Sequence, residues 1–349
     1  MSGPKSIAYI SSWALKIGAK SLELIFKINF MKRKQKIVTI GGGSGQYVLL
    51  SALRDLLNIN ITAIVSMVDS GGSTGRLRDE FGVLPPGDIL KCVLALTPER
   101  EAAREILQTR FKSHNRLRGH NAGNLLLTIL SQHAGSFASG VEALAEVLNC
   151  QGKVLPVTID KATLVAELTD GSQLYGEAAI DVPRGNQRQK IKNAFLVPHH
   201  SDVITVYPPV ISAIREADYI IIGPGDLYTS IVPNFLVPGV KEAINKAKAK
   251  LIYIVNIMTK FGETDNYTAG QFVKTIEKNI GKPVNFVIVN REQPGSAIVN
   301  KYKKEKASLV KCDLAEKRII KADLLEMEGG IIRHNIKNLS EIIIKILNK

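Results

Sequence analysis

The chain has 349 residues, with 46 lysines and arginines against 32 aspartates and glutamates, which gives a formal net charge of +14. This length can bury a full core and allows one large α/β domain with an insertion. Its three cysteines are scattered with no C-x-x-C pair, which argues against a cysteine zinc site or a disulfide framework and fits a reducing cytoplasm. The basic residues form separate clusters with few aromatic residues between them, a pattern that disfavours nucleic acid as the partner.

Residues 1–30 form an N-terminal extension that needs separate treatment. Its apolar stretch is short and is interrupted by Lys16, Lys20 and Lys27, so we expect no transmembrane span and no signal peptide. Met31 precedes a basic stretch and the first strand, and we expect translation to start there. The alternatives are an amphipathic helix on a membrane surface or one packed against the domain.

Hydrophobic patterns predict an α/β order in the first part of the chain. Continuous apolar runs predict strands at 36–40 and 61–67. Helical periodicity predicts helices at 47–57, 88–96, 99–111, 124–133 and 138–148.

From about residue 153 to 198 the pattern changes to short alternating strands, and Asp170-Gly171 has the composition of a hairpin turn. Parallel-sheet character then returns. We expect strands at 219–222, 251–257 and 286–289, and helices at 240–248, 272–279 and 339–347. The predicted fold is a single Rossmann-like α/β domain over 31–349, with a mostly parallel sheet flanked by helices and a small antiparallel β insertion at about 153–198.

A glycine-rich loop, Gly41 to Gly45, joins the first predicted strand to the first helix. Glycines let the backbone approach an anion closely, and the free N–H groups of a helix N-terminus add hydrogen bonds and partial positive charge. A second such loop, residues 69–76, follows the next strand. The pair predicts a phosphate-binding site.

Polar, glycine-rich segments also follow the later strands, at 223–230, 256–259 and 262–265. Ligands of open parallel sheets bind outside the carboxyl ends of the strands. We therefore expect these segments and the two glycine loops to converge on one crevice.

Two common nucleotide-binding patterns are not met. A G-x-G-x-x-G frame that starts at Gly41 places Gln46 where a small residue is needed, which weakens dinucleotide binding without excluding it. No Walker lysine follows the first loop, which argues against P-loop ATP hydrolysis. The phosphate charge must then be met by backbone amides, by Arg76 or by a metal.

Asp69 and Asp88 are the carboxylates best placed to hold Mg2+ against a diphosphate. Each has a structural alternative, because Asp88 follows a Pro-Pro-Gly turn as an N-cap would, and Asp69 could form an Asx-turn. In the same way, Asn124 could cap a helix, and Tyr228 and Tyr267 could stack on a base or simply pack.

Six segments, taken in order, resemble the gluconeogenesis-factor (YvcK-type) branch of the CofD-like family: 40–45, 69–79, 84–88, 119–124, 223–230 and 256–268. The resemblance implies a cytoplasmic protein with a Rossmann-like fold that supports cell shape and cell-wall synthesis on gluconeogenic carbon and binds a nucleotide sugar such as UDP-N-acetylglucosamine. The related transferase branch moves a 2-phospho-L-lactate group onto a deazaflavin with Mg2+.

The resemblance also implies ligand-binding residues. Besides Asp88 they are Gly42, Gly43, Ser44, Gly45, Asp69, Gly71, Gly72, Ser73, Arg76, Asn124, Tyr228, Thr229, Asn256, Met258, Thr259, Tyr267 and Arg333. Ser70 stands where the family has a second aspartate, so the expected metal site is weak and rests on Asp69. Ser44 replaces a threonine, Asp226 replaces a serine, and Ile336 lacks the hydroxyl that phosphorylation would need.

We therefore expect a nucleotide-sugar-binding regulator. A Mg2+-dependent transferase of the phospho-lactate type is the first alternative, and an NAD-binding enzyme is the second. The sequence leaves open whether the chain catalyses a reaction and whether it forms a homo-oligomer.

Overall fold

The computed structural model describes residues 33–70, 75–77, 84–98, 100–112, 117–183, 185, 187–199 and 202–349. The predicted extension 1–30 and the predicted ligand residues Gly71, Gly72 and Ser73 lie outside this range. Within the described part of the chain, no helix combines the length and the hydrophobicity that a bilayer crossing needs.

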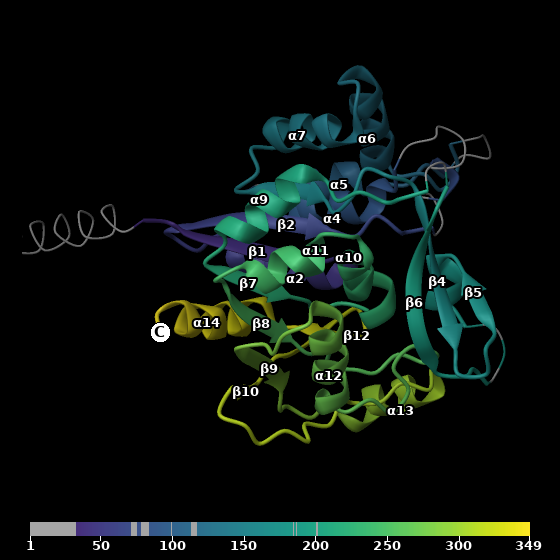
Figure 1. Ribbon diagram of the computed structural model, residues 1–349, viewed down its shortest axis with the longest axis vertical. Helices are drawn as coiled ribbons and strands as arrows, with labels where there is room; N and C mark the ends of the chain where they lie inside the picture. Colours follow the sequence, from purple (N-terminus) through teal and green to yellow (C-terminus); the bar gives the residue numbers. More distant parts are fainter. Residues whose placement is uncertain are drawn as a thin grey trace, which may run out of the picture.

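A seven-stranded parallel sheet forms the centre of the molecule (Figure 1). Its strands, in spatial order, are β10 (Ile319–Ala322), β9 (Phe286–Asn290), β8 (Lys250–Ile254), β7 (Tyr219–Ile222), β1 (Gln35–Gly41), β2 (Ile59–Val65) and β3 (Lys153–Pro156). All six neighbouring pairs are parallel. The order runs outward in both directions from β1 and β7, so the topological switch point of the sheet lies between these two strands. The predicted Rossmann-like fold is confirmed.

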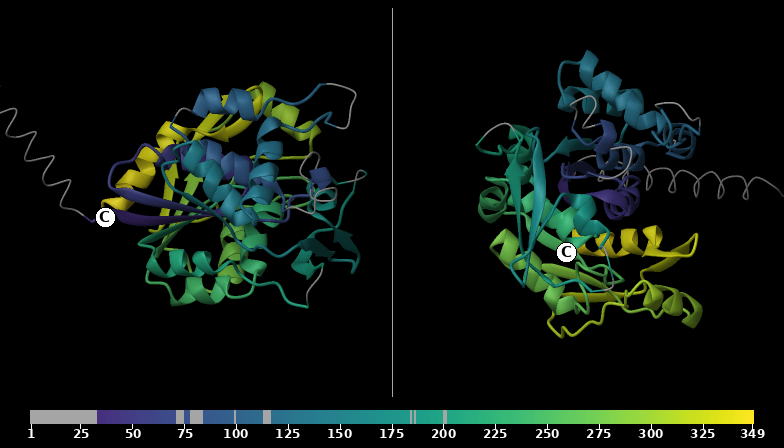
Figure 2. Two further views of the ribbon diagram at one scale, coloured as in Figure 1. Left: turned by 90° about the horizontal axis from the view of Figure 1, so that it is seen from above. Right: turned by 90° about the vertical axis from the view of Figure 1, so that its right-hand side faces the viewer.

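Two groups of helices cover the sheet, one on each face (Figure 2). Helix α2 contacts both α4 and α14, and α11 contacts α9, α10 and α12. Their bounds are α2 (Gly43–Leu53), α4 (Pro86–Leu96), α14 (Ile336–Leu347), α9 (Pro208–Glu216), α10 (Val232–Leu236), α11 (Val240–Lys246) and α12 (Ala269–Ile280). Helices α5 (Arg100–Leu107), α6 (Ala122–His133) and α7 (Phe137–Val147) add to the first group. With helices on both faces, the strands are buried on both sides, as their unbroken apolar runs predict.

The antiparallel insertion is shorter than expected. It consists of β4 (Ala162–Leu168), β5 (Gln173–Tyr175) and β6 (Ile191–Pro198), with α8 (Glu177–Asp181) between the last two strands. The turn at Asp170-Gly171 joins β4 to β5 as a hairpin, and Gly171 takes φ +86° there. The start at residue 153 was wrong, because β3 pairs in parallel with β2 at the edge of the main sheet.

The remaining elements lie around the carboxyl end of the sheet. The π-helix η1 (Leu227–Ile231) follows β7, α13 (Ser296–Lys304) follows β9, and the hairpin of β11 (Leu325–Glu328) and β12 (Ile331–His334) precedes α14. The strand registers pair Gly41 with Val65 and Ile40 with Ile222, so β1, β2 and β7 end at one edge. The loops that carry the predicted ligand residues therefore start side by side.

Candidate functional site

The loop after β1 and the loop after β7 pack directly against each other. A β-carbon built on Gly45 would lie 2.2 Å from the carbonyl oxygen of Pro224, so only glycine allows this contact. The buried amide of Asn234 donates to the carbonyl oxygens of Gly41 (3.2 Å) and Ser230 (2.9 Å) and links the two loops. The glycines thus join two strand ends at the switch point.

Gln46 explains the departure from the dinucleotide-binding pattern. Its side chain is 1% exposed, and its Nε2 donates to Thr39 Oγ1 (3.0 Å) on β1 and to the Ile64 carbonyl (3.1 Å) on β2. A large polar side chain therefore fills the space between helix and sheet where a dinucleotide fold has a small residue. This packing argues against the NAD reading.

A cavity of about 310 Å³ opens over the N-terminus of α2. The N–H groups of a helix's first turn have no acceptor within the helix and can bind an anion. Gly43, Ser44 and Gly45 of this turn line the cavity. The other residues that line it are Gly42, Asp69, Asp88, Lys91, Glu177, Asp181, Gly225, Asp226, Thr229 and Ser230. Among the residues that the structure describes, the lining therefore holds five carboxylates and one cationic side chain, Lys91.

Asp88 faces this cavity and does not cap its helix. Helix α4 starts at Pro86 and has Pro85 at its N-cap, because proline is favoured at the first helical position. Asp88 accepts a hydrogen bond from Lys91 Nζ (2.9 Å), and a β-carbon on Gly42 would lie 2.8 Å from its Oδ2. Burial opposes the charge of Lys91, but the ion pair with Asp88 raises the pKa of this amine above its usual value. Lys91 therefore remains a cation beside the glycine loop.

Glu177 of α8 brings the insertion into the site. Its Oε2 accepts a hydrogen bond from the Ser70 N–H at 3.3 Å. Burial, followed by repulsion from Asp69 and Asp181, raises the pKa of Glu177 to about 7. The carboxyl thus changes charge near neutral pH.

Glu177→Gln should remove a pH dependence of stability. Below pH 4.5 Glu177 carries its proton in both the folded and the unfolded chain; between pH 4.5 and about 7 only the folded chain holds it. Relative to the variant, the wild-type free energy of unfolding should fall across this window by roughly 1 kcal/mol per pH unit, and the difference should stay constant above it. Urea unfolding at pH 4 to 8 measures this. Glu146→Gln on the exposed surface of α7 is the control, and parallel curves for wild type and Glu177→Gln would contradict the expectation.

Two carboxylates that line the cavity over α2 also belong to a cluster of three acids that contacts one lysine. Asp181, Asp226 and Glu263 place one oxygen each within 4.8 Å of one another. Lys260 Nζ contacts all three, at 2.7 Å for Asp226 and 3.2 Å for Glu263. Burial raises the pKa of Glu263 to about 7 although Lys260 opposes this shift. The Lys260 ammonium lies among the three acids, where a metal ion could otherwise bind. Because the acids come from α8 and from the loops after β7 and β8, these ion pairs hold the three segments together.

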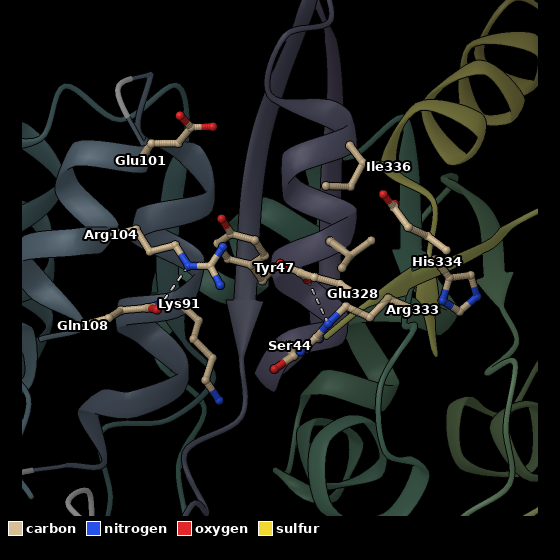
Figure 3. A pocket seen from close by; sticks show the side chains of 12 residues that line it. Ser44, Tyr47, Lys91, Glu101, Arg104, Gln108, Glu328, Arg333, His334 and Ile336 are labelled. Atoms are coloured by element: carbon tan, nitrogen blue, oxygen red, sulfur yellow. Dashed lines mark hydrogen bonds and ion pairs between the residues drawn. The ribbon is translucent and has the colours of Figure 1, made fainter. Parts of the chain in front are cut away.

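Two larger cavities adjoin the glycine loop, and Ser44 lines both. One, of about 590 Å³, lies beside the loops after β7 and β8 and is lined by Asn256, Met258 and Thr259, with the aromatic rings of Phe261 and Tyr302. The other, of about 460 Å³, lies between α5 and the β11–β12 hairpin (Figure 3). Arg333 and His334 line both cavities. Burial lowers the pKa of His334 to about 4, so its ring is neutral near pH 7. The His334 Nε2 lies 3.1 Å from the Val255 carbonyl oxygen, within hydrogen-bond distance.

The structure brings most of the predicted ligand residues to these cavities. The members that line one or more of them are Gly42, Gly43, Ser44, Gly45, Asp69, Asp88, Thr229, Asn256, Met258, Thr259 and Arg333. Asn256 does so while accepting a hydrogen bond from the Gly225 N–H at 3.0 Å. The loops after β1, β2 and β7 and residues 256–259 thus meet at these cavities as predicted, whereas residues 262–265 line none of the three.

Tyr228, Tyr267, Arg76 and Asn124 line none of these cavities. The hydroxyls of Tyr228 and Tyr267 lie 3.3 Å apart, and Tyr267 packs edge-on against Phe272, so these two rings pack against the protein. Arg76 donates to the Arg118 carbonyl at 2.8 Å. Asn124 is buried in the first turn of α6, and the N-cap is Asn121, which accepts from the Asn124 N–H at 2.7 Å.

Several lining residues were missed from the sequence. Lys91 follows Asp88 by one helical turn, a spacing that predicts an ion pair. Arg104 on α5 and Gln108 directly after this helix are likewise four residues apart and form a hydrogen bond. Glu177 and Asp181 belong to a short helix inside the insertion, and nothing in their local pattern places them at the glycine loop.

Comparisons with known proteins agree with this architecture. The family model for 2-phospho-L-lactate transferase CofD matches residues 37–328. The gluconeogenesis factor of Bacillus subtilis (strain 168) is 40% identical over 325 residues, covering 91% of this chain and 100% of the relative. The gluconeogenesis factor of Halalkalibacterium halodurans is 40% identical over 319 residues, with 90% and 97% covered. The crystal structure of protein BH3568 from Bacillus halodurans superimposes with a TM-score of 0.82 at 39% identity, over 89% of this chain and 99% of that one. The chain therefore belongs to the CofD family and, within it, groups with the gluconeogenesis factors.

Proposed function

We propose that the chain binds a nucleotide diphosphate sugar, such as UDP-N-acetylglucosamine, at the carboxyl edge of its sheet. In this proposal the protein is a cytoplasmic regulator that supports cell shape and cell-wall synthesis during growth on gluconeogenic carbon, as its resemblance to the family implies. The observation that carries the proposal is the cavity over α2, where the N–H groups of a helix N-terminus meet Asp69 and Asp88.

The negative charge of this cavity means that a diphosphate would need a divalent cation to bind there. A diphosphate is an anion. Lys91 pairs with Asp88, and Lys260 pairs with Asp181 and Asp226, but the five carboxylates of the described lining still outnumber these two lysines and would repel it. Magnesium is bound by one or two carboxylates together with phosphate oxygens. Asp69 and Asp88 supply oxygen ligands of this kind in the same cavity as the glycine loop. We therefore propose that Mg2+ held by Asp69, with Asp88 beside it, neutralises the diphosphate.

The cavity of about 590 Å³ suits the base of the nucleotide. Its lining combines the flat side chains of Phe261 and Tyr302 with the apolar side chains of Ile257, Met258 and Ile332. A nucleobase stacks on aromatic faces and can accept or donate hydrogen bonds at its edge. The side-chain nitrogen of Asn256, whose oxygen already accepts from the Gly225 N–H, could donate to such a base. The base and the diphosphate would then meet at Ser44.

Calorimetric titration with UDP-N-acetylglucosamine, UDP, GDP and NAD, each with Mg2+ or with EDTA, tests the proposal. We expect the uridine ligands to bind in Mg2+, and to bind at least about tenfold more weakly in EDTA or to Asp69→Asn. Asp202→Asn, an exposed aspartate outside the cavities, is the control. At 100 times its dissociation constant, a ligand should also stabilise the fold by about 2.7 kcal/mol. No binding of any nucleotide at millimolar concentration would refute the proposal.

A Mg2+-dependent transferase remains the second candidate, because the same cavity could hold a metal and a diphosphate leaving group. The matching family model, which is that of a phospho-lactate transferase, favours it. Mg2+-dependent transfer of a 2-phospho-L-lactate group that is lost in Asp69→Asn would establish the transferase and displace the regulator.

A further inference from the structure

The cleft between α5 and the β11–β12 hairpin has a different chemistry from the other two cavities (Figure 3). Its volume is about 460 Å³, within the range of small-molecule pockets. Glu101 and Arg104 come from α5, Gln108 follows directly after this helix, and Glu326 and Glu328 come from β11. Tyr47 of α2 lies between the two walls. Most of these side chains are hydrogen-bonding groups, whereas the lining of the cavity assigned to the base is more apolar.

The cleft adjoins the cavity that we propose for the diphosphate. Ser44 and Lys91 line both the cleft and the cavity over α2, so the two spaces meet at the glycine loop. Arg333 and His334 separate the cleft from the aromatic cavity on the other side and line both. Consider a nucleotide sugar with its diphosphate at Ser44 and its base between Phe261 and Tyr302. The sugar, at the opposite end of the diphosphate, can then enter this cleft.

We propose that this cleft binds the sugar of the nucleotide sugar, with Arg104 and Gln108 as the residues that recognise its polar substituents. The inference rests on the proposed function and deepens it. Carboxylates accept hydrogen bonds from sugar hydroxyls, whereas a guanidinium and an amide nitrogen donate to hydroxyl or acetamido oxygens. Glu101 and Glu326 supply the acceptors, and Arg104 and Gln108 supply the donors.

Local contacts hold the donors in place. Arg104 Nε donates to Gln108 Oε1 at 3.2 Å, and its guanidinium carbon lies 5.7 Å from the centroid of the Tyr47 ring. Among the described residues, the two terminal nitrogens of Arg104 and the Nε2 of Gln108 have no hydrogen-bond partner. These donors are positioned along one helix face and remain available to a ligand. A site built to hydrogen-bond a substituent discriminates strongly against a ligand that lacks it.

Comparing the affinities of the protein for UDP and for UDP-N-acetylglucosamine isolates the contribution of the sugar to binding. With the full chain and Mg2+, calorimetry should show that wild type binds the sugar nucleotide more tightly than UDP. Arg104→Ala and Gln108→Ala should each weaken the sugar nucleotide by about tenfold or more and change UDP affinity less than twofold. The double variant should bind both ligands alike. Glu105→Ala, an exposed neighbour on α5 that lines none of these cavities, should change neither affinity.

Each of the following outcomes would overturn either this inference or the proposed function. Equal weakening of both ligands in Arg104→Ala would place the nucleotide, and not the sugar, in the cleft and overturn the inference. Unchanged binding of both ligands by the double variant, or equal affinity of wild type for the two, would also overturn it while leaving the proposed function intact. Failure of wild type to bind either ligand would refute the proposed function itself. Circular dichroism and the melting midpoint confirm that the variants remain folded.

Discussion

Gly45→Ala should lower the free energy of unfolding by about 3 kcal/mol or more. The added β-carbon would lie 2.2 Å from the Pro224 carbonyl oxygen and 2.9 Å from the Gly225 nitrogen, both backbone atoms. Neither can rotate away as a flexible side chain would, so the loops after β1 and β7 must separate. In a chain of this size the melting midpoint should fall by roughly 2 °C for each kcal/mol. Urea unfolding and a melting curve measure the two effects.

Gly295→Ala is the matched control for this substitution. Gly295 is likewise at a helix N-terminus, as the N-cap of α13, its φ of −60° suits alanine, and a β-carbon there meets no atom within 4 Å. We expect it to cost less than about 1 kcal/mol. Gly45→Ala should also lose nucleotide binding at temperatures where it stays folded, because the two loops form the cavity together. Similar small effects from both substitutions would show that the loop contact contributes little.

The central sheet could be predicted because its signal is local. The inner strands are buried on both faces and appear in the sequence as apolar runs, such as Tyr219 to Ile222 and Leu251 to Val255. The edge strands β3 and β10 are partly exposed and were not predicted as members of this sheet. The convergence of the loops follows from the parallel arrangement itself, since the carboxyl ends of parallel strands share one edge. The glycine-rich loop after β1 and its place at the strand edge could therefore be predicted from the residues next to a strand.

Other elements were missed although a signal was present. Gly329 and Gly330 take φ values of +58° and +74° in the tight turn between β11 and β12, and a Gly-Gly pair between short alternating segments is a hairpin signature. Pro86 could have moved the start of α4 two residues earlier and removed Asp88 from the N-cap position. In both cases the glycine or proline residues, and not the hydrophobic pattern, indicate where the element begins or turns.

The composition of the site depended on long-range contacts that no local pattern contains. Glu177 accepts a hydrogen bond from Ser70, 107 positions earlier, and Lys260 contacts Asp181, 79 positions earlier. Conversely, Tyr228 and Tyr267 look available for stacking in the sequence, but their hydroxyls face each other in the structure. Burial decides between packing and binding for such residues, and burial is set by the tertiary fold.

Lys260→Met should be the most destabilising change outside the glycine loops. It would leave the carboxylates of Asp181, Asp226 and Glu263 within 4.8 Å of one another without the ammonium that contacts all three. Glu263 is 3% exposed, so its charge cannot be solvated well by water. Removing one partner of a buried ion pair typically costs about 3–5 kcal/mol, and we expect a loss of this size at pH 8, measured by urea unfolding.

The pH dependence of this loss identifies its cause. Once the neutralising lysine is gone, protonation of Glu263 should relieve the repulsion, so the difference between Lys260→Met and wild type should shrink as the pH falls from 8 to 5. The double variant Lys260→Met/Glu263→Gln should recover part of the stability at pH 8 because it removes the buried charge. Lys192→Met, which breaks an exposed ion pair with Glu167, should cost less than about 1 kcal/mol. A loss for Lys260→Met that is independent of pH and not relieved by Glu263→Gln would mean that the lysine stabilises the site through packing of its alkyl chain and not through its charge.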